Sequence, residues 1–325
     1  MPRTHYSGER QRALGKRRKL VTFMVIVMIP LTLLASVFLL NNTKYMITSL
    51  LVIGYTMVPF FMVFEKKKPK AREIVLIATM TALTVCVHIF FHLTIPIQIG
   101  TAMVVIAGIG LGPEAGFLVG ALSRLVCNFY LGQGPWTPWQ MFCWGLMGFL
   151  AGALFAVKSK AEKAEDFDGG EGKTLRKTSA FTGWISPVIC ILAFEVAAYL
   201  TYLIAPGEDD SFWGWRIYAF GAAGIFVGAI TLKRKIPITN LSISIYTFFA
   251  TIILFGGIMN MAMMLYSSGI SGGQPVSINT LRTLYITGFP YDLSHGIIAS
   301  CCTFVIGKPM IEKIERIKIK YGLYR

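Results

Sequence analysis

The amino-acid sequence predicts an all-α polytopic integral membrane protein with about ten transmembrane helices. Of its 325 residues, 54% are hydrophobic and only 14% are charged, whereas a soluble domain carries roughly 25% charged residues. The apolar residues form successive runs long enough to span a bilayer, which takes about 20 residues. Basic residues give a net charge of +15 and cluster at the ends of these runs. That placement indicates membrane topology rather than a nucleic-acid-binding face.

The basic clusters also predict the orientation of the chain. Residues 1–20 carry seven Lys and Arg residues against one acid, Glu9, which places the N-terminus in the cytoplasm. The first apolar run, 20–40, exceeds the 7–15 residues of a signal-peptide core, so we interpret it as a retained helix. The helices are expected near residues 20–40, 45–64, 71–91, 95–111, 114–130, 139–157, 183–204, 214–232, 239–266 and 287–306.

The connecting segments agree with this alternation. The charged segment 158–182 reads as a cytoplasmic linker, and 267–284, rich in Ser and Gly, as an outer loop. The basic tail after Lys308 is expected to form an amphipathic cytoplasmic helix. Both termini and every strongly basic loop then lie on one side of the membrane.

A partial internal repeat relates two of the expected helices. Residues 139–145 align with 215–221, and glycines continue at matching positions beyond both segments. The pattern indicates either a local duplication or two helices that share an interfacial Trp and a glycine face.

Ionisable residues inside expected helices are candidates for function, because a charge within a bilayer is costly. Arg124 lies in helix 114–130, and Asp292 and His295 lie at i, i+3 in helix 287–306. That spacing predicts that Asp292 and His295 face one side. At similar depth, Arg124 and Asp292 either form a structural ion pair or together surround a polar ligand. Glu195 has no assigned role.

No metal site or cofactor is expected. His88 and His92 have i, i+4 spacing, but no nearby carboxylate or cysteine completes a ligand set, so interfacial histidines are favoured. The six cysteines lie in apolar runs and are expected to pack. The sequence contains no HExxH or GxxxxGK[ST] motif, and neither an enzyme nor an ATPase is expected.

Two further patterns allow a functional and a structural interpretation. The segment 133–140 holds Gln133, Trp136, Trp139 and Gln140, and this density suits ligand contact as well as membrane anchoring. Ala78 and Ala82 form a small-xxx-small pair, which serves either internal helix packing or a docking face for a partner.

Two stretches resemble the substrate-binding S components of energy-coupling factor (ECF) vitamin transporters. The first contains EAGFLVGALSR at 114–124 and GQGPWTPWQM at 132–141, and the second contains GFPYDLSHG at 288–296, followed by GKPM at 307–310 and ERI at 315–317. The resemblance covers about 71–157 and 238–320. It implies an outward-facing vitamin site, for which the expected residues are Arg124, Asn128, Gln133, Trp136, Trp139, Gln140, Tyr291, Asp292 and His295.

The resemblance also implies partners. In S components the Ala-x-x-x-Ala pair, here Ala78 and Ala82, docks on a transmembrane coupling (T) component that works with two ATPase subunits. The family has a six-helix core, and this chain departs from it by two extra helix pairs. The expected division is 1–70, a basic segment with the first extra pair; 71–157, four core helices; 158–237, a linker with the second extra pair; and 238–325, two core helices and a tail.

Three functions of different classes follow. The leading hypothesis is a vitamin-binding S component in a prokaryotic plasma membrane, with both termini cytoplasmic. The partial repeat favours a self-sufficient secondary transporter of a small polar solute, because such transporters are often built from repeats. A membrane enzyme acting on lipid is the third, but the sequence offers no nucleophile or metal set for it.

Overall fold

The computed structural model describes residues 71–94, 98–156, 172–205, 212, 214–231, 236–267 and 277–321, together with 23, 27–32, 35 and 51. Most of the predicted helices at 20–40 and 45–64 and much of the 158–182 linker lie outside the described residues. Nearly every described element is helical, which confirms the all-α prediction. The number of transmembrane helices stays a prediction.

The described helices follow the order of the predicted ones. They are α4 (Ala71–Thr94), α5 (Gly100–Leu111), α6 (Pro113–Leu131), α7 (Trp136–Leu154), α9 (Gly172–Ile204), α10 (Trp215–Thr231), α11 (Asn240–Phe249), α12 (Gly257–Ser267), α13 (Ile278–Cys302) and α14 (Lys308–Lys320). The π-helices η2 (Ala250–Gly256) and η3 (Thr303–Gly307) join α11 to α12 and α13 to α14. A two-residue parallel pairing links β1 (Phe155–Ala156) to β2 (Ile236–Pro237).

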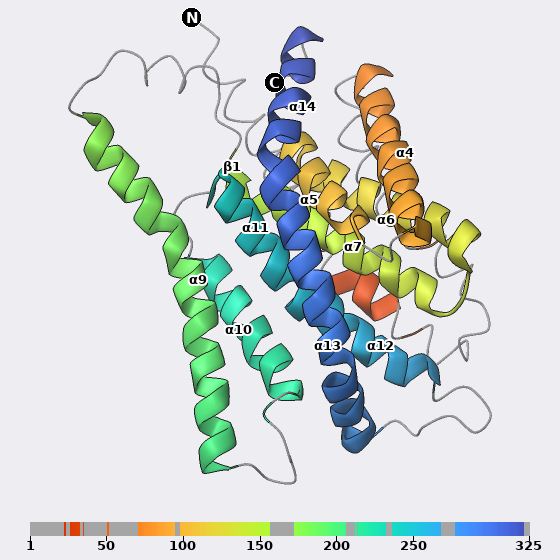
Figure 1. The fold of residues 1–325 in the computed structure, drawn as a ribbon, viewed down its shortest axis with the longest axis vertical. Helices are drawn as coiled ribbons and strands as arrows, with labels where there is room; N and C mark the ends of the chain where they lie inside the picture. Colours follow the sequence, from red (N-terminus) through yellow and green to blue (C-terminus); the bar gives the residue numbers. More distant parts are fainter. Residues whose placement is uncertain are drawn as a thin grey trace, which may run out of the picture.

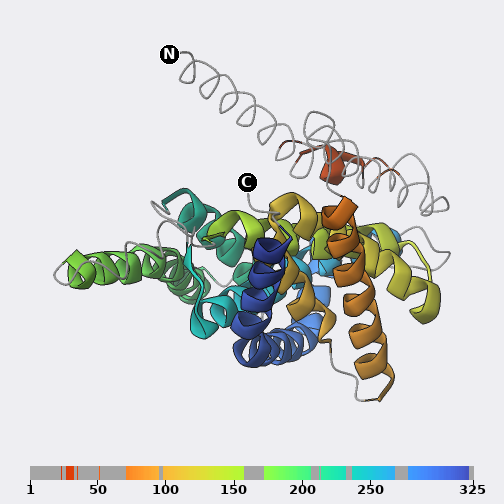
Figure 2. The same cartoon turned by 90° about the horizontal axis from the view of Figure 1, so that it is seen from above.

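Two described helical segments have the length and apolar composition of membrane spans. Within the described part of the chain, α4 and the continuous segment Asn240–Leu265 are long enough to cross a bilayer. Gly100–Leu111 and Val188–Ile204 are shorter apolar helices. In Figures 1 and 2, α9 and α10 lie at one side of the molecule and α4 lies toward the opposite side.

Glycines let α5, α6 and α7 approach closely. A Cβ at Gly108 would lie 2.1 Å from the carbonyl oxygen of Gly148, and one at Gly148 would lie 2.4 Å from that of Gly116. Small residues permit such backbone contact between membrane helices. In α10, a Cβ at Gly224 would lie 2.8 Å from Cα of Ile191 in α9. The glycine faces of both members of the partial repeat therefore serve close packing, each against different helices.

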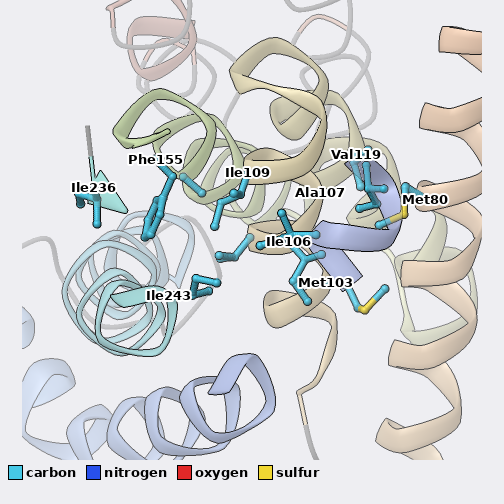
Figure 3. Packing of buried hydrophobic residues seen from close by; sticks show 13 residues of the cluster. Met80, Met103, Ile106, Ala107, Ile109, Val119, Phe155, Ile236 and Ile243 are labelled. Atoms are coloured by element: carbon cyan, nitrogen blue, oxygen red, sulfur yellow. The ribbon is translucent and has the colours of Figure 1, made fainter. Parts of the chain in front are cut away.

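A buried hydrophobic cluster joins the first core helices to the end of the chain. Met103, Ile106 and Ile109 of α5 lie beside Phe155 and Ile243 (Figure 3). Ile311 and Ile314 of α14 belong to the same cluster. The C-terminal helix thus buries an apolar face and leaves Arg316 and Lys320 exposed, as expected for an amphipathic helix.

Two predicted boundaries were wrong, and one predicted helix contains an irregular segment. Helix α13 begins at Ile278, so 278–284 is helical rather than part of the outer loop. The side chain of Ser277 caps it by accepting from the Thr280 N–H at 3.1 Å, and this N-cap lies within a stretch whose polar composition reads as loop. Helix α9 begins at Gly172 rather than near 183. The segment predicted as one α-helix at 239–266 contains the wider turns of η2.

Candidate functional site

Arg124 lies at the centre of a polar cluster inside the helix bundle. Its Nε donates to Oε1 of Gln140 at 2.9 Å, and its Nη1 lies 3.0 Å from Nε2 of His88. The guanidinium carbon lies 5.1 Å from the ring centroid of Trp144, a cation–π distance. Helix α6 carries Arg124, α7 carries Gln140 and Trp144, and α4 carries His88. The close packing of α5, α6 and α7 on their glycines brings these side chains together.

A second row of hydrogen bonds supports the first. Asn128, one turn after Arg124, donates from Nδ2 to Oε1 of Gln140 at 2.9 Å and to Oγ1 of Thr137 at 3.0 Å. Oε1 of Gln140 therefore accepts from both Arg124 and Asn128, which fixes the orientation of its amide. The structure thus brings three predicted site residues together.

Asp292 does not pair with Arg124. Its Oδ2 accepts from the hydroxyl of Tyr218 at 2.6 Å and from Nδ2 of Asn260 at 2.8 Å. A Cβ at Gly256, the last residue of η2, would lie 2.5 Å from Cγ of Asp292, so the glycine makes room for the carboxyl group. The proposed Arg124–Asp292 ion pair was therefore wrong, because the inserted helix α10 supplies the partner of Asp292.

The other two candidates on α13 contact different elements. Nε2 of His295 lies 2.9 Å from Oγ1 of Thr101 in α5, and its ring meets Phe255 edge-on at 5.1 Å between centroids. The hydroxyl of Tyr291 accepts a hydrogen bond from the side-chain amide of Gln98. His295 and Asp292 are both buried, at 2% and 5% exposure, but their partners lie in different helices. The two side chains therefore both face the interior of the bundle, where each meets its own set of partners.

The residues of the 133–140 segment divide into two groups. Gln140 belongs to the Arg124 cluster, whereas Trp139 is 4% exposed and packs in a hydrophobic cluster with Phe117. The ring of Trp136 lies against Gly134, where a Cβ would be 2.4 Å from it. Gln133 donates to the backbone oxygen of Leu125 at 3.2 Å. Of these four predicted residues, only Gln140 contacts Arg124.

Ala78 and Ala82 are both exposed on α4. The same helix exposes Val75 and Leu83, at 62% and 40%. Internal packing is therefore not the role of this small-residue pair within the described structure, and the face is open to a partner or to lipid.

Sequence reasoning missed several members of the site. His88 was interpreted as interfacial, but it is fully buried against Arg124 and Trp144. The sequence gives no reason to select three other members, beyond a polar atom in an apolar helix: Thr101, Tyr218 and Asn260. For His88, that same signal was present in the sequence, because an ionisable side chain in a membrane helix calls for a partner. No group of three metal-ligating side chains occurs among the described residues.

Of the three helices that carry the Arg124 cluster, α4 is long and apolar enough to span a membrane. Residues 68–180, about a third of the chain, match the family model of the ECF-type riboflavin transporter, S component. The match confirms the resemblance of this segment to ECF S components, and it contains Arg124, Gln140, His88 and Trp144. Neither the curated proteins nor the solved structures that were compared give a match.

Proposed function

We propose that this chain is the substrate-binding membrane component of an ECF-type ABC importer. It captures a vitamin or related micronutrient from outside the cell, and partner subunits drive uptake with ATP. The protein then resides in a prokaryotic plasma membrane, crosses it several times and keeps both termini in the cytoplasm. The basic clusters of the sequence support this orientation.

The observation that carries the proposal is the Arg124 cluster in the family-matched segment. A permanent guanidinium charge inside an apolar bundle costs free energy, and residues of this kind therefore mark functional sites in membrane proteins. Here Gln140, His88 and Trp144 surround Arg124, and each comes from a helix of the matched segment. Aromatic walls with a few placed polar groups are the usual construction of a small-molecule site.

The partners are a T component and two ATPase subunits. The exposed Ala78 and Ala82 on α4 support a T-component contact, because small side chains let a second helix approach closely. The inserted helices α9 and α10 lie at the opposite side of the bundle from α4 (Figure 2). They therefore leave the face of α4 free for docking.

Small-molecule mass spectrometry of the purified protein tests the binding function. We expect a vitamin-class molecule to co-purify with the wild-type chain and to be lost from Arg124→Gln. The matched control is Arg316→Gln, which removes the same charge from an exposed position on α14. Equal retention by Arg124→Gln would show that the cluster does not hold the ligand.

A further inference from the structure

The Arg124 guanidinium retains unused hydrogen-bond donors. Arginine has five N–H groups, and two of them are directed to Gln140 and His88. Both partners are uncharged acceptors. Among the described residues, no carboxylate lies within salt-bridge distance of Arg124, and Asp292 is engaged by Tyr218 and Asn260 instead. The positive charge of Arg124 thus has no negative partner in the described structure.

His88 and Trp144 add two more unused donors. An arginine N–H can only donate, so Nε2 of His88 must accept and the ring must carry its proton on Nδ1. That Nδ1 is buried and has no hydrogen-bond partner, and the same holds for Nε1 of Trp144. Both side chains are fully buried, and their rings meet edge-on at 5.0 Å. A buried donor without a partner costs about 1–3 kcal/mol.

Nδ1 of His88 and the six-membered ring of Trp144 both lie beside Gly100. A Cβ at Gly100 would lie 2.4 Å from Cη2 of Trp144 and 2.9 Å from Nδ1 of His88. The next residue, Thr101, contacts Nε2 of His295, whose Nδ1 is buried without a partner. Polar atoms without a partner therefore gather around Arg124, which has no negative partner among the described residues.

We propose that the ligand presents an anionic, acceptor-only group, a carboxylate or a phosphate, to Arg124. The proposal rests on the proposed function, because it specifies the chemical class of ligand at the same site. An anionic oxygen group neutralises the guanidinium charge and accepts from the N–H groups of Arg124 that Gln140 and His88 leave unused. A neutral ligand leaves the guanidinium charge uncompensated.

Matched pairs of vitamins that differ in one charged group test this. The pairs are riboflavin with flavin mononucleotide, pyridoxal with pyridoxal phosphate, and nicotinamide with nicotinate. The affinity of each molecule for the purified full chain is measured by isothermal titration calorimetry. Any molecule that co-purifies with the chain is identified by mass spectrometry. We expect the anionic member of at least one pair to bind at least tenfold more tightly, and the first two pairs separate phosphate from the carboxylate of the third.

Variants tie the preference to the cluster. Arg124→Gln should abolish the preference for the anion, Arg124→Lys should keep part of it, and Arg316→Gln should leave it unchanged. A neutral member that binds as tightly as its anionic counterpart, or a neutral co-purified ligand, overturns the charge proposal and leaves the binding function standing. If no probe binds and nothing co-purifies, both the charge proposal and the binding function are contradicted.

Discussion

The contact between Tyr218 and Asp292 joins the inserted helix α10 to the last core segment, and its removal has a calculable effect. Tyr218→Phe deletes only the hydroxyl that donates to Oδ2 of Asp292 at 2.6 Å. Tyr218 is 3% exposed, so water does not readily replace the lost donor. Hydrogen bonds to charged groups contribute about 1.5–3 kcal/mol, while polar pairs in a membrane protein average about 0.6 and reach about 1.7 kcal/mol. We therefore expect a loss of about 1–2 kcal/mol in the free energy of unfolding.

The ring of Tyr218 should keep its position in the variant. It stacks on Tyr285 with centroids 4.4 Å apart and planes inclined by 26°, and Tyr285 is held by a 3.0 Å hydrogen bond to the backbone oxygen of Gly257. Phenylalanine preserves this stacking, so the substitution isolates the hydroxyl. The assay is reversible unfolding in mixed micelles, measured for Tyr218→Phe, Asp292→Asn and the double variant.

The double-mutant cycle measures the interaction energy between Tyr218 and Asp292 directly. We expect a coupling energy of about 1 kcal/mol between the two positions. Tyr199→Phe is the matched control, because Tyr199 is a half-exposed tyrosine of α9. Removing its hydroxyl should change the free energy of unfolding by less than about 0.5 kcal/mol. If the free-energy change of the double variant equals the sum of the two single changes within about 0.3–0.5 kcal/mol, there is no energetic link between α10 and Asp292.

Two further predictions concern the partner face and the core. Less T component should co-purify with the double variant Ala78→Trp/Ala82→Trp, because bulky side chains hold helices apart, while its ligand affinity should be unchanged. Recovery of the T component at the wild-type level would exclude these positions from the interface. Trp139→Ala should lower the free energy of unfolding by about 3–5 kcal/mol, because Trp139 is packed in the core. An unchanged unfolding midpoint combined with lost ligand affinity would instead place Trp139 in the binding site.

Much of the helical layout could be predicted from the sequence. The expected break between the helices at 95–111 and 114–130 falls at Gly112, between α5 and α6, and the φ of +106° there suits a glycine. Arg124 was recognised as a site candidate because an ionisable side chain inside an apolar helix indicates function. Gln140 was recognised from the polar and aromatic density of 133–140, and Asn128 from the resemblance to S components. The structure brings these three together.

The partners of Asp292 could not be predicted in the same way. Periodicity shows which face of a helix a residue occupies, but not which distant helix packs against that face. Tyr218 lies in an inserted helix and Asn260 follows a π-helical segment, so neither contact follows from local spacing. His88 was misplaced for a related reason, because its spacing within α4 does not show that Arg124 of α6 and Trp144 of α7 pack against it.

The central claim, that this chain binds the substrate and depends on partners for transport, is tested most directly by uptake into liposomes. The purified chain is reconstituted alone, and in parallel with a T component and two ATPase subunits, and uptake of its co-purified ligand is followed with and without ATP. We predict ligand binding without accumulation for the chain alone, and ATP-dependent accumulation for the complete assembly. Accumulation by the chain alone, driven by an ion gradient without ATP, would contradict the account and establish a secondary transporter.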